Sequence, residues 1–234
     1  MGSCNPSGAN KLQFILHDVC LDHVINHDVR RRIEAVELDV ACTRDGSLVV
    51  LPCAAALEKE SAFVVATTNE IHALDPKMFP PIGVVLDKLS ELGFSVILDL
   101  KARLNEERLF ASAIQEASRP SLLFVSYNHR LVRLLAEFRG EESCGIIFAG
   151  LPVDIPQLSR RAGASWVVMQ SRFLSESLCQ NLRESNMHAM TFSARTTERL
   201  QEAISSGADA IMVDYEIAKS LPFRGDLIES ENSE

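Results

Sequence analysis

Apolar runs of strand length alternate with amphipathic segments along most of this chain. The runs are mostly continuous in hydrophobicity, which is typical of a parallel sheet covered on its outside by helices. Between them, apolar residues recur every three to four positions, as on one face of a helix. The predicted strands are Leu12–Leu16, Ala35–Ala41, Val96–Leu100, Leu122–Ser126, Gly145–Phe148, Trp166–Met169, His188–Phe192 and Ala210–Val213, and the clearest helices are Glu106–Ala117, Arg130–Phe138, Ser175–Glu184 and Thr197–Ser205.

Strands joined by helices in a chain of 234 residues predict a single α/β domain, a (β/α)₈ TIM barrel. A doubly wound open sheet is the alternative. No glycine-rich phosphate loop follows the first predicted strand, which argues against a dinucleotide-binding fold. We expect the barrel to span residues 12–223, between a flexible N-terminus at 1–11 and an acidic tail at 224–234.

One region, at about 48–81, does not follow the alternating pattern. Its first residues, Leu48–Leu51, can pair with the preceding strand through a turn at Asp45-Gly46. Pro80-Pro81 then leads into a predicted helix at Gly83–Leu92. We interpret the region as an insertion in the second βα loop of the barrel.

Composition and charge limit the classes of partner. The net charge of −9 argues against a nucleic-acid partner, which needs a basic surface. No segment approaches the ~18 to 20 apolar residues of a membrane span, and the first residues lack a signal-peptide core. The start MGSC is similar to an acylation signal, but Pro6 stands where that signal needs Ser or Thr. We therefore expect a cytoplasmic protein.

Two carboxylates lie at alternate positions of the second predicted strand. Side chains alternate across a strand, so Glu37 and Asp39 point to one side, and Val36, Leu38 and Val40 point to the other. An unpaired buried carboxylate is costly. A strand that turns two acids inward therefore indicates a metal site or an active site.

Other polar residues also follow the apolar runs, at the ends where barrel enzymes carry their active sites. Carboxylate oxygens suit Mg²⁺ or Ca²⁺, and a lysine ammonium can hold a phosphate oxygen. The pattern predicts a hard-cation and phosphate site. The polar residues at these ends are His17, Glu37, Asp39, Asp99, Lys101, Ser126, Asn128 and Gln170.

Simpler interpretations exist for each residue on its own. His17 could be a capping or core histidine, and Glu37 and Asp39 could pair with arginines. Asp99 and Lys101 could form an ordinary salt bridge. The joint pattern on three successive predicted strands favours a functional site.

These motifs resemble those of the glycerophosphodiester phosphodiesterase family, over roughly residues 12 to 221. The resemblance implies a phospholipase-C-like barrel with a divalent cation at Glu37, Asp39 and Asp99, a phosphate contact from Lys101, and His17 as a catalytic histidine. It also implies a small phosphodiester or lysolipid substrate. The matching segments are His17-Asp18-Val19, Glu37-Leu38-Asp39-Val40, Thr43-Arg44-Asp45-Gly46, Asp99-Leu100-Lys101, Ser126-Tyr127 and Gly207–Asp214.

Two features are similar to a sister branch, the sphingomyelinase D-like phospholipases. The connection between His17 and Glu37 is short, and the third predicted strand ends in Asp-Leu-Lys. The Glu-Asn-Thr element of the glycerophosphodiesterases does not occur here.

The chain departs from the family at its second catalytic histidine. The family reads Val-Val-Leu-His-Asp where this sequence reads Val49-Val50-Leu51-Pro52-Cys53, and Asp18 replaces the arginine that follows the first histidine. Phe192 and Arg195 replace a tryptophan and an asparagine near the seventh strand. The matches and the departures together leave two alternative functions. The chain is either a divalent-cation-dependent phosphodiesterase or an inactive barrel that binds a phosphorylated ligand or a protein partner.

Overall fold

The structure is a computed structural model that describes residues 12–17, 26–51, 70, 79–116 and 122–223. The expected N-terminal segment at 1–11, the acidic tail at 224–234 and most of the insertion at 48–81 lie outside the described residues. The domain boundaries of the sequence analysis therefore stay predictions.

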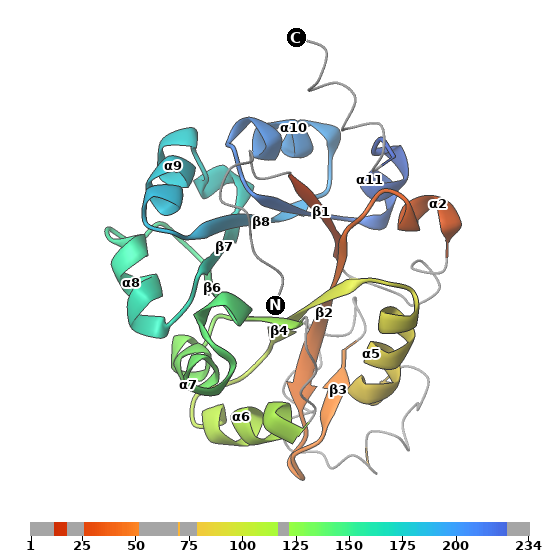
Figure 1. Ribbon diagram of the computed structural model, residues 1–234, viewed down its shortest axis with the longest axis vertical. Coiled ribbons are helices and arrows are strands. Elements are labelled where there is room, and N and C mark those ends of the chain that lie inside the picture. The colour runs from red at the N-terminus through yellow and green to blue at the C-terminus, as the bar shows by residue number, and fades with distance from the viewer. Residues whose placement is uncertain (1–11, 18–25, 52–69, 71–78, 117–121, 224–234) are drawn as a thin grey trace, which may run out of the picture.

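Parallel strands of the described chain close into a barrel (Figure 1). β1 pairs with β9 on one side and with β2 on the other, so the ring has no open edge. This closure confirms the (β/α)₈ prediction and excludes the open sheet. The barrel strands are β1 (Gln13–Leu16), β2 (Ala35–Cys42), β4 (Ser95–Leu100), β5 (Leu122–Ser126), β6 (Cys144–Phe148), β7 (Trp166–Gln170), β8 (His188–Ala194) and β9 (Ala210–Val213).

Helices surround the ring of strands (Figure 1). Several begin at a polar residue whose side chain accepts from the first free backbone N–H groups, such as Asn128, Ser175 and Thr196. No helix of the described ranges is long and apolar enough to cross a membrane. The helices are α2 (His27–Arg30), α5 (Ile82–Glu91), α6 (Glu107–Glu116), α7 (His129–Arg139), α8 (Ile155–Ala162), α9 (Glu176–Glu184), α10 (Thr197–Ser205) and α11 (Tyr215–Ser220), with short 3₁₀ turns η1 (Glu141–Ser143) and η2 (Ser171–Phe173).

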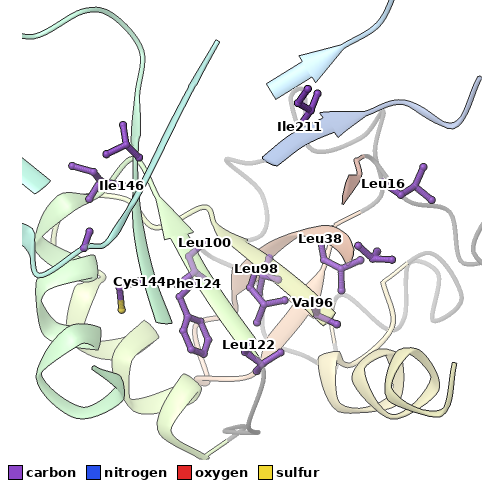
Figure 2. Close-up of a cluster of buried hydrophobic side chains, with 14 of the residues drawn as sticks. Leu16, Leu38, Val96, Leu98, Leu100, Leu122, Phe124, Cys144, Ile146 and Ile211 are labelled. Atoms are coloured by element: carbon purple, nitrogen blue, oxygen red, sulfur yellow. The ribbon is translucent and has the colours of Figure 1, made fainter. Parts of the chain in front are cut away.

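Each strand divides its side chains between two cores. The outer core lies between strands and helices and includes Leu38, Leu98 and Phe124 (Figure 2). The inner core fills the barrel. Glu37 and Asp39 continue the inward row of β2 toward its carboxyl end, as the alternation of apolar and acidic residues predicted. The inner core consists of Ile15, Ala35, Ile97, Val125, Ile147, Val168, Met190, Ala210 and Met212.

A hairpin extends β2 beyond the ring. β3 (Leu48–Val50) pairs antiparallel with the end of β2, and Gly46 takes the positive φ of +83° that the turn requires. This confirms the expected pairing through Asp45-Gly46. After β3, the N–H of Leu51 donates to the carbonyl of Asp39 at 2.8 Å. The hairpin thus holds Leu51 beside an acidic residue of the barrel mouth.

Candidate active site

A cavity of about 700 Å³ opens at the carboxyl ends of the barrel strands. Its floor includes inner-core residues such as Val125, Val168 and Met212. The five residues that the sequence analysis singled out for metal binding and catalysis all line it: His17, Glu37, Asp39, Asp99 and Lys101. The structure therefore brings them together, and their roles stay a proposal.

The three acidic residues form one cluster because of strand register. β2 and β4 are adjacent and parallel, and Asp39 is directly opposite Asp99 in their ladder. Glu37 precedes Asp39 on the same face of β2. One carboxylate oxygen from each of the three lies within 4.8 Å of the others. Oxygen ligands at such mutual distances are suited to one hard cation.

Lys101 lies between two of these carboxylates. Its Nζ is 2.8 Å from Oδ1 of Asp39 and 2.5 Å from Oδ2 of Asp99. Burial alone would lower the pKa of Lys101, but the two carboxylates outweigh it and raise the pKa above its usual value. The lysine therefore stays charged. The salt bridge considered for Asp99 and Lys101 is present and includes Asp39 as well.

Burial raises the pKa values of the two innermost acids. The pKa of Glu37 is well above its ordinary value, first because of burial and then because of the charges of Asp39 and Asp99. Burial raises the pKa of Asp99 to about 6, against the opposing pull of Lys101. Three carboxylates and one ammonium leave the cluster with a formal negative charge that a divalent cation would offset.

An unbonded oxygen supports the same ligand set. Oδ1 of Asp99 is buried and has no hydrogen-bond partner among the described residues. A buried polar atom without a partner is costly, and a bound cation would satisfy it. The residues present therefore fit a cation of the Mg²⁺ or Ca²⁺ type at Glu37, Asp39 and Asp99.

His17 connects this cluster to a further acid. Its Nε2 is 3.9 Å from Oε2 of Glu37, and its Nδ1 is 3.7 Å from Oδ1 of Asp214. Asp214 follows β9 as His17 follows β1, and these two strands are paired. On its far side, Oδ2 of Asp214 lies 3.5 Å from Nε of Arg195. Sequence reasoning missed Asp214 as a site residue, although it ends an apolar run as His17 does.

Residues at and directly after the ends of β7 and β8 form another wall of the cavity. A register shift between Thr191 and Ala194 marks a bulge in β8, and such bulges redirect the side chains that follow. Arg195 follows directly. The comparison of motifs had noted Phe192 and Arg195 only as replacements near the seventh strand, and Arg172 and Arg199 belong to no motif that it used. The wall consists of Gln170, Ser171, Arg172, Phe192, Arg195, Thr196 and Arg199.

Two polar residues expected at the mouth have structural roles instead. Ser126 is buried outside the barrel and donates from Oγ to the carbonyl of Leu100 at 2.6 Å. It faces outward because Val125 and Tyr127, on either side of it, line the cavity. Oδ1 of Asn128 accepts from the first N–H groups of α7 as its N-cap. The prediction that these two residues belong to the mouth site is therefore wrong.

The two aspartates of the Gly207–Asp214 motif lie at opposite ends of the barrel. Asp209 is buried, and its Oδ2 accepts from the N–H of Ala189 at 2.8 Å, at the amino ends of β8 and β9. Arg183 lies 3.8 Å from its other oxygen. Asp209 thus fixes the barrel base, and of the two aspartates in this motif only Asp214 lies near His17.

Comparison by sequence finds no matching family model and no matching curated protein. Comparison by structure finds the same fold in solved phosphodiesterases. A glycerophosphodiester phosphodiesterase from Parabacteroides distasonis superposes with a TM-score of 0.75 at 15% identity, covering 96% of this chain and 99% of that chain. A putative glycerophosphodiester phosphodiesterase from Galdieria sulphuraria superposes with a TM-score of 0.73 at 13% identity, covering 92% of this chain and 98% of that chain. A phosphodiesterase from Oleispira antarctica, solved with its product sn-glycerol-3-phosphate, superposes with a TM-score of 0.68 at 15% identity, covering 89% of this chain and 96% of that chain.

These likenesses establish the fold. The chain has the barrel of the glycerophosphodiester phosphodiesterases, which agrees with the resemblance of its motifs. The acidic cluster, Lys101 and His17 occupy the end of the barrel at which such folds carry their active sites.

Proposed function

We propose that this chain is a divalent-cation-dependent phosphodiesterase that hydrolyses glycerophosphodiester or lysophospholipid-like substrates. The observation that carries the proposal is the convergence of three carboxylates, Lys101 and His17 in one cavity of a phosphodiesterase-type barrel. One structure of the same fold holds sn-glycerol-3-phosphate, a product of such a reaction. Features of the sphingomyelinase D-like branch, above all Asp99-Leu100-Lys101, extend the proposal to lysolipids.

In this proposal Mg²⁺ or Ca²⁺ binds to Glu37, Asp39 and Asp99. The bound ion would offset charge on the phosphate oxygens. Lys101 would bind the same phosphate: an ammonium has three N–H donors, and Asp39 and Asp99 accept two of them. The third remains for a phosphate oxygen.

His17 is the proposed catalytic base or nucleophile. In its role as base, Nε2 takes a proton from water as the water oxygen bonds to phosphorus. The bond from phosphorus to the alcohol oxygen then breaks, and the alcohol takes up a proton. Asp214, beside Nδ1, favours the tautomer that leaves Nε2 free to accept. Among the described residues that line the cavity, His17 is the only imidazole.

One sequence feature favours a second function, ligand binding without hydrolysis. The family's second histidine corresponds to Pro52, which cannot transfer a proton. Cys53 beside it is a poor substitute, because the ordinary pKa of a cysteine thiol is about 8.5. Both residues lie outside the described part of the chain. A barrel with one histidine would retain phosphate binding through Lys101 and the cation, and its ligand would be a phosphorylated molecule or a protein partner.

A turnover assay distinguishes the two functions. The purified protein is incubated with Mg²⁺ or Ca²⁺ and with glycerophosphocholine, glycerophosphoserine or lysophosphatidylcholine, and released alcohol is measured. Hydrolysis that stops with a chelator and in Asp39→Asn supports the phosphodiesterase. Calorimetric binding of glycerol 3-phosphate without turnover supports the binder, and neither turnover nor binding refutes both.

A further inference from the structure

The carboxylates of the acidic cluster and a group of arginines occupy opposite walls of the cavity. The acids lie on β2 and β4, whereas the wall formed after β7 and β8 carries three arginines, here called the arginine arc: Arg172, Arg195 and Arg199. The chain as a whole has a net charge of −9. Three guanidinium groups on one wall are therefore a local cluster of positive charge in a protein of net negative charge. The function proposed above gives these arginines no role.

Three neighbouring elements supply the arc. Arg172 lies in η2, Arg195 directly follows the bulged end of β8, and Arg199 lies in the first turn of α10. η2 is in contact with both β8 and α10. Arg172 therefore lines the same cavity as Arg195 and Arg199, which are more than twenty residues further along the chain.

The charges of the arc are only partly neutralised. Nη1 of Arg199 is 2.6 Å from Oε2 of Glu202, and Nε of Arg195 is 3.5 Å from Asp214, yet their side chains are 50% and 66% exposed. The guanidinium of Arg172 lies 4.7 Å from the centre of the Phe173 ring, and no carboxylate of the described ranges forms an ion pair with it. Each arginine lines the cavity and has more N–H donors than these contacts occupy.

The arc is separate from the proposed phosphate site. Going from Arg195 toward the acidic cluster, Asp214 and then His17 intervene before Glu37 is reached. A phosphate beside Lys101 is therefore on the opposite wall from the arc. A cavity of about 700 Å³ has room for a ligand that reaches both walls.

We propose that the arginine arc binds a second anionic group of the substrate, a phosphomonoester or a carboxylate carried by the alcohol beyond the reacting phosphate. This rests on the phosphodiesterase proposed above and narrows its substrates to phosphodiesters with an acidic head group. The planar guanidinium matches both anions through paired N–H donors. A cationic head group such as choline would instead meet like charges.

Two pairs of commercial ligands test this, because the members of each pair differ in one anionic group. Glycerophosphoinositol 4-phosphate is compared with glycerophosphoinositol, and glycerophosphoserine with glycerophosphoethanolamine. Dissociation constants are measured by calorimetry on chelator-treated protein, so that binding is read without turnover. We expect the more anionic member of at least one pair to bind about tenfold more tightly, the effect of one charge-assisted contact. The pair that shows this preference identifies the anion.

Variants assign the preference to the arc. The double variant Arg172→Gln/Arg199→Gln should lose it, while Arg133→Gln/Arg160→Gln, which removes two exposed arginines of α7 and α8 outside the cavity, should keep it. Equal affinities within both pairs, absence of binding, or a preference that survives in Arg172→Gln/Arg199→Gln would overturn the inference. A preference in a protein that hydrolyses nothing would refute the phosphodiesterase and leave the arc established.

Discussion

Asp214 and His17 face each other where β9 and β1 close the barrel. Oδ1 of Asp214 lies 3.7 Å from Nδ1 of His17, and neither atom has a hydrogen-bond partner within the described ranges. The separation exceeds a hydrogen bond but is short enough for the carboxylate charge to act on the ring. The pairing of β1 with β9 thus places an acid behind the proposed catalytic imidazole.

Replacing that acid tests whether it orients His17. Asp214→Asn keeps the shape and removes the charge that favours a proton on Nδ1. We expect kcat to fall at least about tenfold, less than the ~10⁴ found when a directly bonded acid is lost, with KM little changed. Glu216→Gln, an exposed acid two residues further on, is the control. A drop of the same size in both variants would contradict a specific role for Asp214.

The acidic cluster should bind a hard divalent cation. Asp39→Asn removes one of the three ligand carboxylates while keeping its size, so calorimetric binding of Mg²⁺ or Ca²⁺ should disappear. Asp28→Asn, which neutralises an exposed acid of α2, should bind as the natural protein does. Identical titrations of Asp39→Asn and the natural protein would show that the cation site lies elsewhere.

Cation binding should weaken in acid. With its pKa at about 6, Asp99 takes up a proton as the pH falls below that value, and a cation must displace this proton to bind. The raised pKa of Glu37 acts in the same direction. At pH 5 Asp99 alone would weaken binding about tenfold relative to pH 7. Titrations of the natural protein at both values measure this. An affinity that is unchanged or higher at pH 5 would contradict ligation by these two acids.

A histidine at position 52 should raise activity. Leu51, the residue before it, donates its N–H to the carbonyl of Asp39, and Pro52 itself lies outside the described residues. Pro52→His would supply a proton donor with a pKa near neutrality, and general acid catalysis typically contributes ~10² to 10⁴ in rate. Turnover of a glycerophosphodiester in the cation-loaded variant measures the gain.

Two controls belong to that experiment. Pro52→Ala separates the gain from simple removal of proline, and adding His17→Ala to Pro52→His should abolish the gain, because two imidazoles that act together are strongly non-additive. A folded, cation-binding Pro52→His protein with no gain in rate would mean that position 52 does not correspond to the family's second histidine.

Two glycines should respond oppositely to alanine. A Cβ at Gly145 would come within 2.8 Å of Cβ of Trp166 and 3.0 Å of Cγ1 of Val125, inside the closely packed barrel, so Gly145→Ala should destabilise by about 1 to 3 kcal/mol. A Cβ at Gly83, in α5, would meet no atom of another described element within 4 Å, and alanine should stabilise by about 0.5 kcal/mol. Urea denaturation measures both; a stabilising Gly145→Ala would contradict the crowding.

The barrel could be predicted because its strands are buried on both faces. Continuous apolar runs marked every barrel strand to within two residues, and the longest miss was at β8, which continues past Phe192 to Ala194. The β-bulge near the end of β8 does not alter the hydrophobic pattern of the sequence, so that pattern could not predict it. The acidic cluster could also be predicted, since Glu37 and Asp39 interrupt an otherwise apolar strand at alternate positions.

The rest of the site follows from packing that a single sequence does not show. Ser126 was placed at the mouth because it ends a strand, whereas alternation from Val125 turns it outward. Arg172 and Arg199 lie in a short 3₁₀ turn and a first helical turn, where neither residue interrupts a periodic pattern. Their approach to one cavity depends on how η2 packs against α10.

The bulge in β8 indicates where this barrel can accept insertions and deletions. The strands that carry the acids alternate strictly, so deleting one residue from β4 before Asp99 would turn that carboxylate into the outer core and an outer leucine into the cavity. β8 already absorbs an irregularity between Thr191 and Ala194 without losing its pairing to β9. Insertions and deletions are therefore best tolerated beside the arginine arc. Related chains can thus change their preference for a head group by gaining or losing residues there, whereas the acidic wall can change only by substitution.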